Sequence, residues 1–411
     1  MDITAVTALL NEQARALYRG KIARGDGFLF YSGNAAEKFK EVLLSAAPCG
    51  KVLLLFDKSG FAAMGKILSA AAESAGCKPF CVVVEEGYDF IKAASGALCA
   101  PEEIRLVAVC GRSMLKLVAY CARIRGVPLA VIQTSVKACG VLSPHVFFKN
   151  GDKPDVFRAE IKRHIIFDED AIAASAAADT AEAYLDTESR IPALTDYRIA
   201  CVIKGERAAK EEYSLAREAI LAVYNIFGHG KEDRAALLLY NGMLSELANA
   251  GARGKLFDFS ALSLADEMFF GGRSGGGLKL RMYSVISGIY YLYFDGKFDK
   301  ITEYPDYLAR ADEISARTGT DKGVILSGLR KQAAVLNKSA KKIRDIKDRL
   351  KAEIISQNAS ASAVSAAYYA LGGKGGADEK EAAFAVKHCG DLPFGINGIT
   401  LAREEGFTEY L

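Results

Sequence analysis

A strand, a tight turn, a helix and a second strand follow one another between residues 106 and 144, and this succession most constrains the fold. The first apolar run, residues 106–109, enters the turn Cys110-Gly111-Arg112-Ser113, after which a helix begins. A second apolar run, residues 128–132, opens into the loop 133–144. Such a turn directs unpaired backbone N–H groups and the positive end of a helix at one point, which favours a phosphate. Open α/β sheets bind ligands at this end of their parallel strands.

The same alternation of strands and helices appears earlier in the chain. Residues 52–56 and 80–84 are two further apolar runs, with a helical pattern between them. Nearly continuous apolar strands are typical of a parallel sheet that helices cover on both faces. We also expect a short strand at residues 28–31 and a helix that Asn34 caps. These patterns predict a Rossmann-like, nucleotide-binding-type α/β domain over residues 1–164.

Helical periodicity replaces the strand pattern in the second part of the chain. Strand signals fade after Phe148, and Ala-rich helical patterns with short connections begin at Ala171. The longest pattern has an apolar stripe from Ile325 to Ile354 on a helix rich in lysine and arginine, and we expect its charged face to be solvated. The predicted fold class is therefore α/β plus all-α, with a C-terminal helical domain over residues 165–411.

Composition excludes several classes of protein. A chain of 411 residues, 51% of them hydrophobic, is long enough for two domains with large cores. Its 53 basic and 50 acidic residues leave a net charge of +3, too balanced to indicate nucleic-acid binding. The nine cysteines are scattered and are expected to be buried free thiols. The first residues lack a basic segment ahead of an apolar one, so we expect no secretory signal, and no apolar run approaches the roughly 18 residues of a membrane helix. We therefore expect a protein of the reducing cytoplasm that binds neither nucleic acid nor membrane.

The turn, helix and loop resemble the glycerol-1-phosphate dehydrogenase branch of the iron-containing alcohol dehydrogenase and dehydroquinate synthase-like superfamily. That branch has Gly-Gly-Gly-Ser-x-x-Asp-x-x-Lys after its strand, then Arg-Gly-Ile-Pro, then Pro-Thr-x-x-Ser-Asn-Asp-Gly-x-x-Ser-Pro. The chain keeps this spacing and shares Gly111, Ser113, Arg125, Gly126, Pro128, Thr134, Gly140, Ser143 and Pro144. It departs at Cys110, Arg112, Lys116, Ala119, Gln133, Lys137, Ala138 and Cys139. The resemblance implies a dehydroquinate synthase-like fold, in which residues 165–168 form a short crossover into the helical domain.

The resemblance also implies a zinc or iron site made by a carboxylate and two histidines, where the metal polarises an oxygen during hydride transfer. Asp179 matches the carboxylate, but no histidine occurs between His229 and His388. A catalytic zinc normally has three protein ligands, so Asp179 alone is insufficient, and we do not expect zinc or iron to bind. Asp266 and Glu267 would make an all-carboxylate site that prefers Mg or Mn, although solvated helix carboxylates are more common.

Candidate cofactor-binding or anion-binding residues gather at the carboxyl ends of the predicted strands. They are Asp57, Gly111, Arg112, Ser113, Lys116, Thr134 and Lys137. Asp57 either meets a ribose or caps the helix at Ser59-Gly60. Arg112 stands in place of a glycine and is expected to obstruct NAD(P) in the family's pose. Arg112, Lys116 and Lys137 either form a cationic site for an anion such as a phosphate ester or point to solvent. The glycine-rich segment 271–277 is either a second anion nest or a hinge between helices.

Two functions are compatible with these residues. The first is a divergent glycerol-1-phosphate dehydrogenase-like protein that binds a phosphorylated small molecule or nucleotide in the interdomain cleft and has lost metal-hydride chemistry. The second is an active NAD(P)-dependent polyol-phosphate or alcohol dehydrogenase with a rearranged metal site. Loss of both histidines and of two turn glycines favours the first. A homo-oligomer is compatible with either function.

Overall fold

A computed structural model describes residues 2–18, 27–85, 88–101, 103–110, 114–138, 140–150, 153–272, 274–295, 306–357, 361–376, 378–389 and 397–404. The chain forms two compact units. The first contains Met1–Asn150, Asp155–Ala183 and Ala222–Gly251, and the second contains Gly151–Pro154, Tyr184–Leu221 and Ala252–Leu411. The boundary predicted after residue 164 falls within the first unit and inside a strand.

The first unit is organised around a six-stranded sheet in which every pairing is parallel. Its strands are β1 (Phe28–Gly33), β2 (Lys51–Asp57), β3 (Lys78–Val84), β4 (Ile104–Cys110), β5 (Leu129–Gln133) and β8 (Arg163–Asp168). They lie in the order β1-β8-β5-β4-β2-β3. After β3 the chain returns to the other side of β2 to form β4, so the direction of strand addition reverses between β2 and β4. The parallel sheet predicted from the apolar runs is confirmed.

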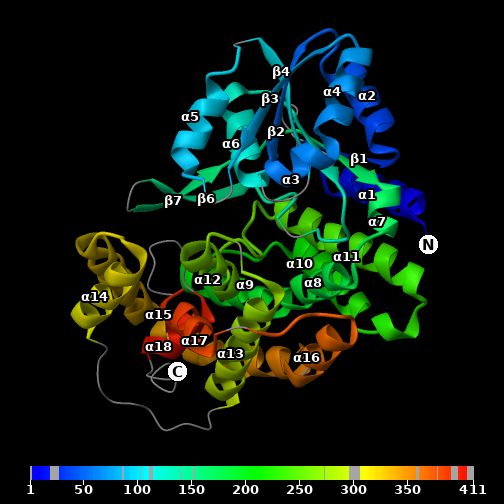
Figure 1. Ribbon diagram of the computed structural model, residues 1–411. Coiled ribbons are helices and arrows are strands. Elements are labelled where there is room, and N and C mark those ends of the chain that lie inside the picture. Colours follow the sequence, from blue (N-terminus) through cyan, green and yellow to red (C-terminus); the bar gives the residue numbers. More distant parts are fainter. Residues whose placement is uncertain are drawn as a thin grey trace. The chain divides into compact units, whose positions relative to one another are not determined.

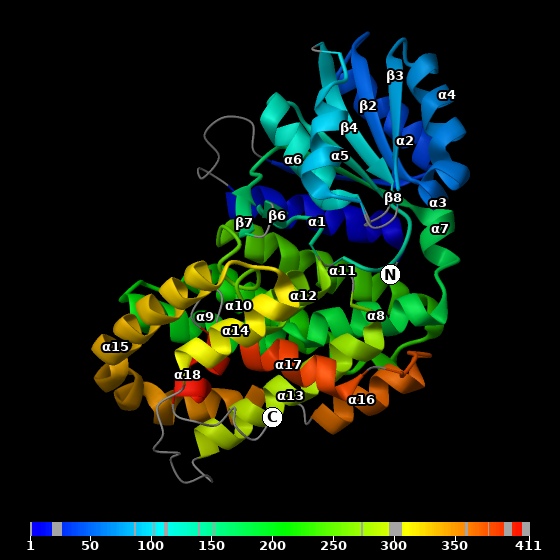
Figure 2. The ribbon, with the colours of Figure 1, turned by 60° about the vertical axis from the view of Figure 1, so that its left-hand side comes forward.

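Helices cover both faces of this sheet (Figures 1 and 2). One face carries α2 (Ala35–Ala46) and α4 (Lys66–Ser74), and the other carries α5 (Phe90–Leu98) and α6 (Leu115–Arg125). The remaining helical segments of the unit are α1 (Ile3–Tyr18), α3 (Lys58–Gly60), η1 (Phe61–Gly65), α7 (Glu169–Ala173), η2 (Ile226–Gly228) and α11 (Lys231–Gly251). Asn34 caps α2 as expected, since its side chain accepts from the N–H groups of Ala36 and Glu37.

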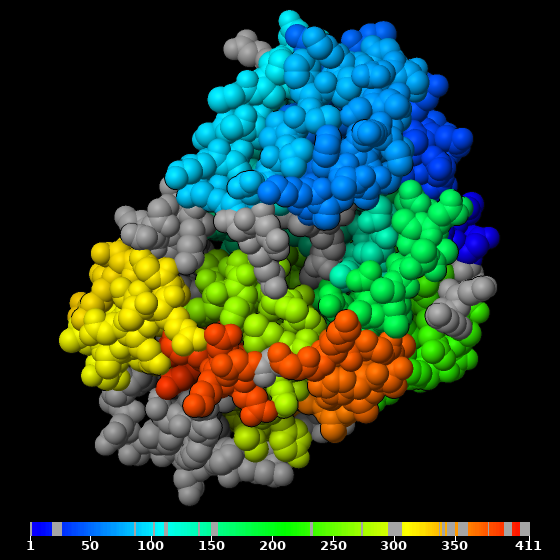
Figure 3. Space-filling view, viewed as in Figure 1, coloured from blue at the N-terminus to red at the C-terminus, as the bar shows by residue number. Residues whose placement is uncertain are grey.

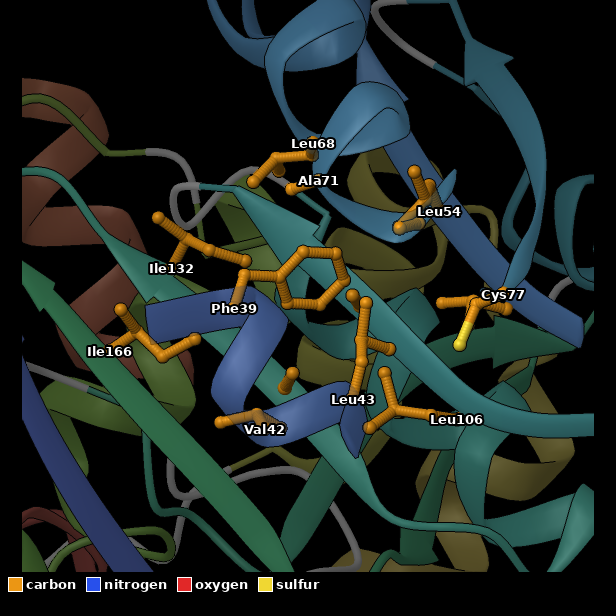
Figure 4. Packing of buried hydrophobic residues seen from close by; sticks show 14 of the residues in the cluster. Phe39, Val42, Leu43, Leu54, Leu68, Ala71, Cys77, Leu106, Ile132 and Ile166 are labelled. Carbon is orange, nitrogen blue, oxygen red and sulfur yellow. The ribbon is translucent and has the colours of Figure 1, made fainter. Parts of the chain in front are cut away.

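The core between α2, α4 and the sheet explains why these strands are apolar almost throughout (Figure 4). Phe39 and Leu43 of α2 are fully buried against Leu54, Leu106 and other side chains of the strands. Fully burying an aliphatic or aromatic side chain contributes roughly 1.5–3 kcal/mol to the free energy of unfolding. Because several such side chains pack between α2, α4 and the strands, this layer stabilises the sheet that positions the strand ends.

Two features after residue 144 differ from the prediction. Strands β6 (His145–Asn150) and β7 (Lys153–Arg158) pair in a separate two-stranded sheet. Residues 165–168, predicted as a crossover, belong to β8, which lies inside the sheet between β1 and β5. The expectation was wrong because a short apolar run has the same pattern in a buried strand and in a connecting segment.

The second unit is helical. It contains α9 (Arg190–Lys204), α12 (Ala261–Phe270), α13 (Gly276–Asp295), α14 (Tyr307–Thr318), α15 (Lys322–Gln357), α16 (Ala361–Ala370), α17 (Glu379–Cys389) and α18 (Gly398–Glu404). Helices α8 (Ala177–Glu188) and α10 (Lys210–Val223) have residues in both units. No strand follows β8 in the part of the chain that the structure describes, as predicted.

The predicted apolar stripe of the longest helix is confirmed at Ile325, Leu329, Leu336 and Leu350 of α15, all of which are buried. Among the helices of the second unit, α14, α16 and α17 contribute visible surface in Figure 3. Exposed side chains such as Leu308 of α14 and Tyr369 of α16 agree with that view. None of the helices in the described ranges is both long and apolar enough to cross a membrane. The eight cysteines within those ranges are free thiols; five are buried as expected, whereas Cys49, Cys81 and Cys99 are exposed.

Candidate ligand-binding site

The carboxyl ends of β2 and β4 adjoin at the point where strand order reverses. Asp57, the last residue of β2, caps α3, since its Oδ1 accepts from the N–H of Gly60 at 2.6 Å and from the hydroxyl of Ser59 at 2.7 Å. A Cβ at Gly60 would lie 3.8 Å from the carbonyl oxygen of Cys110, so the β2 turn approaches the end of β4 closely. The capping role predicted as one alternative for Asp57 is therefore present.

Cys110, the last residue of β4, is a buried thiol rather than a nucleophile. Burial raises the pKa of its thiol to about 12, and the negative charges of Asp168 and Asp57 add to that effect. Asp168 is the last residue of β8 and caps α7 through the N–H of Ala171. The carboxylates at the ends of β2 and β8 thus lie close enough to the end of β4 to oppose ionisation of the Cys110 thiol.

The turn predicted to bind phosphate is described only in part. Gly111, Arg112 and Ser113 lie outside the described residues. Helix α6 begins at Leu115, so Lys116 lies in its first turn, as predicted. The side chain of Lys116 is half-buried. Met114, which precedes the helix, makes no side-chain cap.

The far end of α6 is anchored by Arg125. Its guanidinium donates to the carbonyl oxygens of Leu98, Ala100 and Pro101 at 2.8–3.0 Å. Gly126 then ends the helix in the left-handed conformation, with φ 67°. Arg125 and Gly126, two residues of the resemblance, are thus structural and fix the direction of α6.

The loop after β5 is held from within by the buried polar side chains of Gln133 and Arg163, whose hydrogen bonds no local sequence pattern predicts. Gln133 is 1% exposed, and its Nε2 donates to the carbonyl oxygen of Ser135 at 2.8 Å and to that of Lys137. Thr134 beside it is half-buried. Arg163 of β8, 2% exposed, donates to the carbonyl oxygens of Val141 and Ser143.

Lys137 lies against two carboxylates of α8. Its Nζ is 2.7 Å from Oδ1 of Asp179 and 3.1 Å from Oε2 of Glu182. Burial alone lowers the pKa of this ammonium, but the hydrogen bonds and charges of Asp179 and Glu182 outweigh burial and raise it. The cluster of one ammonium and two carboxylates has a net charge of −1. The predicted grouping of Lys137 with an anion is therefore disfavoured by the contacts that its ammonium makes.

The second unit contains a similar cluster. Lys279 of α13 places its Nζ 2.8 Å from Oδ1 of Asp186 and 3.8 Å from Oδ2 of Asp266. Oδ1 of Asp266 accepts from the N–H of Ser274 at 3.1 Å, and its carbonyl oxygen accepts from the N–H of Gly272 at 3.0 Å. Two N–H groups of the glycine-rich segment are therefore already satisfied by Asp266. This arrangement favours the hinge interpretation over an anion nest, although Arg273 lies outside the described residues.

The donor atoms near Asp179 and Asp266 do not fit a zinc or iron ion. Each carboxylate pairs with a lysine ammonium, which takes the coordination space that a cation would need. No group of three histidine, cysteine, aspartate or glutamate side chains suited to a metal occurs within the described ranges. A metal ion at the all-carboxylate site considered for Asp266 and Glu267 would first have to displace the ammonium of Lys279.

Sequence spacing contained one signal for these clusters. Asp179, Glu182 and Asp186 lie three and four residues apart, which puts their carboxylates on one face of α8. The lysines that pair with them come from a loop and from another helix, at sequence distances that no local pattern reveals. Glu182, Asp186 and Lys279 were therefore missed as site residues.

Asp196 connects four helices of the second unit. Its Oδ2 accepts from the N–H of Ala261 at 2.8 Å, and its Oδ1 accepts from the N–H of Gly398 at 2.7 Å and from the hydroxyl of Tyr290. Burial raises the pKa of its carboxyl to about 6, although these three hydrogen bonds lower it. Asp196 of α9 thereby ties together the starts of α12 and α18 and the middle of α13.

Comparison with known proteins yields matches among solved structures alone: no family model and no curated protein matches this sequence. A 1,3-propanediol oxidoreductase is 13% identical, with a TM-score of 0.56 over 93% of this chain and 97% of the other. An archaeal alcohol dehydrogenase from a Red Sea brine pool, bound to NZQ, is 12% identical, with a TM-score of 0.54 over 93% and 96%. The iron-containing alcohol dehydrogenase of Thermococcus thioreducens is 13% identical, with a TM-score of 0.52 over 89% and 93%. The chain has the fold of the iron-containing alcohol dehydrogenases.

This likeness confirms the predicted fold class, a Rossmann-like domain with a helical domain, over nearly the whole chain. Because identity is so low, the likeness concerns the fold alone. Function in an iron-containing alcohol dehydrogenase fold has to be argued from the residues at the site, where this chain has lysine–carboxylate clusters.

Proposed function

We propose that this chain is a divergent glycerol-1-phosphate dehydrogenase-like protein that binds a phosphorylated small molecule or nucleotide and does not perform metal-dependent hydride transfer. The phosphate binds at the carboxyl end of β4, where α6 begins. The observation that carries the proposal is the reversal of strand order between β2 and β4, because open α/β sheets bind ligands in the crevice beyond such a point.

The charges near the start of α6 favour a compact anion. Lys116 lies in the first turn of the helix, and Arg112 precedes it in the turn. Positive charge this near the start of α6 in the sequence is expected to attract an anion to the backbone N–H groups there, and an arginine can bind phosphate oxygens through two parallel hydrogen bonds. Lys137 is left out of this anion site because Asp179 and Glu182 already bind its ammonium.

The same arginine disfavours a dinucleotide. Glycine in a phosphate turn allows the pyrophosphate to approach the backbone, and Arg112 replaces that glycine with a long side chain. A ligand with a single phosphate therefore suits the turn better than NADH or NADPH. The donor set at Asp179, with no histidine and with an ammonium in contact, supports the absence of metal-dependent chemistry.

The alternative is an active NAD(P)-dependent alcohol or polyol-phosphate dehydrogenase. It is favoured by the length of the structural match, since the fold is shared with enzymes named as dehydrogenases or oxidoreductases over more than nine-tenths of each chain. Such an enzyme would have to move Lys137 away from Asp179, or use a different metal site.

Titration calorimetry separates the two functions. The unmodified chain is titrated with glycerol 1-phosphate, AMP, NADH and NADPH, and we expect the single-phosphate ligands to bind more tightly. Arg112→Gly should weaken their binding about tenfold or more, the effect of losing one charge-assisted contact, and should strengthen NADH binding. Arg123→Ala, which changes an exposed arginine at the other end of α6, serves as the control and should change neither.

Elemental analysis of zinc-loaded and iron-loaded protein after desalting completes the test. We expect neither metal to be retained in stoichiometric amount. Tight NADH or NADPH binding by the unmodified chain, together with zinc or iron that is lost in Asp179→Asn, would contradict the proposal and favour the dehydrogenase.

A further inference from the structure

The contact between Lys137, Asp179 and Glu182 is shielded from water on several sides. The three side chains are 21%, 31% and 35% exposed, so none of them is a freely solvated surface charge. Hydrogen bonds between charged groups in such positions are shorter and stronger than those between neutral groups. The ammonium is therefore a fixed part of the site.

A cation between the two carboxylates offsets their mutual repulsion. Asp179, in the first turn of α8, has a favourable interaction with the start of the helix, but Glu182 is only three residues further on, and two like charges at this spacing repel each other. Partial burial increases the repulsion, because the surroundings screen it less than bulk water does. Both oxygens converge on one Nζ, which marks the position of the cation.

The loop delivers Lys137 to that position with little freedom. Gln133 fixes the backbone through its bonds to the carbonyl oxygens of Ser135 and Lys137, and Arg163 fixes the following residues through Val141 and Ser143. Two buried polar side chains thus hold the backbone of the loop on both sides of Lys137. Preorganisation of this kind reduces the entropy lost when the ion pair forms.

We propose that the ammonium of Lys137 is the resident cation of this site and has taken the place of a divalent metal beside Asp179 and Glu182. The inference rests on one part of the proposed function, the absence of metal chemistry at Asp179, and explains why no metal binds there. One ammonium leaves the carboxylate pair with a net charge of −1, whereas a divalent ion would neutralise it. Removal of the ammonium therefore creates a site for a hard, oxygen-preferring ion such as Mn²⁺.

Lys137→Met tests the inference, because methionine keeps the unbranched side chain and removes the charge. Mn²⁺ binding is measured by calorimetry and by electron paramagnetic resonance, and the melting temperature is measured with and without 1 mM Mn²⁺, about the range in which weak oxygen-ligand sites fill. We expect one Mn²⁺ per chain in the variant, bound at least tenfold more tightly than by the unmodified chain, and a higher melting temperature in its presence. Lys137→Arg should behave as the unmodified chain does.

Two controls isolate the carboxylate pair. Lys137→Met with Asp179→Asn should bind no Mn²⁺, because one of the two oxygens is lost. Lys38→Met removes a lysine that pairs with the single carboxylate of Glu41 at 2.8 Å on α2, and it should gain no Mn²⁺ site.

Two results would overturn the inference. One is a folded Lys137→Met chain whose melting temperature and Mn²⁺ binding equal those of the double variant. The other is Asp179-dependent Mn²⁺ binding by the unmodified chain, which would mean that Lys137 moves aside for a metal. If Lys137→Met folds only when Mn²⁺ is present, by circular dichroism, the inference is supported, and failure to fold in both conditions counts against it. Failure of phosphate-ester binding would refute the proposed function without altering any of these metal measurements.

Discussion

Glu188 provides the sharpest test of the physical reasoning in the second unit. It is the last residue of α8 and is completely buried, and neither of its carboxyl oxygens has a hydrogen-bond partner among the described residues. Burial raises the pKa of this carboxyl from 4.5 to about 8. The folded protein therefore holds Glu188 protonated near neutral pH, whereas the unfolded chain ionises it.

The sign of the pH dependence follows from the raised pKa. The stability associated with protonated Glu188 is fully present below about pH 4.5 and is lost as the pH rises through about 8. At roughly 1.4 kcal/mol per pH unit, the free energy of unfolding falls by less than about 1 kcal/mol at pH 5 and by about 3 kcal/mol at pH 7, relative to acidic pH. This decrease approaches about 5 kcal/mol above pH 8, where the folded form ionises as well.

Glu188→Gln removes this ionisation and keeps the shape of the side chain. The variant should therefore gain about 3 kcal/mol of unfolding free energy relative to the unmodified chain at pH 7, and less than about 1 kcal/mol at pH 5. Urea denaturation at the two pH values measures the difference. Circular dichroism is the appropriate signal, because the chain has no tryptophan. The comparison between pH values cancels any constant effect of the new amide.

Glu218→Gln is the matched control, since Glu218 is an exposed glutamate of α10 and its replacement should change stability by less than about 0.5 kcal/mol at either pH. Equal pH dependence in Glu188→Gln and in the unmodified chain would refute the reasoning, because it would mean that water or a charged partner reaches Glu188.

Two further predictions concern the contacts of Asp196. Asp196→Ala should lower the free energy of unfolding by about 3–5 kcal/mol in urea denaturation, because it leaves the N–H groups of Ala261 and Gly398 and the Tyr290 hydroxyl unsatisfied in the interior; a loss below about 1 kcal/mol would contradict the role of Asp196. Gly398→Ala should lower the melting temperature, at a cost of about 1–3 kcal/mol, because the added Cβ would lie 2.5 Å from the ring of Tyr290. Gly288→Ala, where no atom lies within 4 Å of the added Cβ, should be neutral or slightly stabilising, and equal melting temperatures for the two variants would show that Tyr290 moves freely.

The first half of the fold was readable from the sequence because its signals are local. Strands β2, β4 and β5 are nearly continuous apolar runs between turn residues, which is what burial on both faces of a parallel sheet requires. The edge strand β3 has an apolar run as well, although most of its side chains are exposed or half-buried. Asn34 could be identified as a helix cap because a cap bonds to N–H groups two and three residues further on. In each case the decisive partner lies within a few residues, or the burial of a whole segment determines its composition.

The position of β8 could not be derived in the same way. Its apolar run pairs with β1, more than 130 residues earlier, and with β5. Nothing within residues 165–168 distinguishes a strand that completes a sheet from a short connection, because both are buried and apolar. Only the assembled sheet, with a vacant edge beside β5, determines that choice.

In the candidate site, too, some features follow from local sequence signals and others only from the folded structure. The strand ends and the start of α6 could be located from the apolar runs, and Asp179 was singled out as a candidate by motif spacing. The prediction grouped Lys137 with Arg112 and Lys116 because its loop follows a neighbouring strand, whereas the folded loop directs its ammonium to Asp179 and Glu182. A long, flexible side chain is oriented by the charges that surround it in space. Those charges come from α8, more than 40 residues away in the sequence, so only the tertiary structure determined which groups the lysine binds.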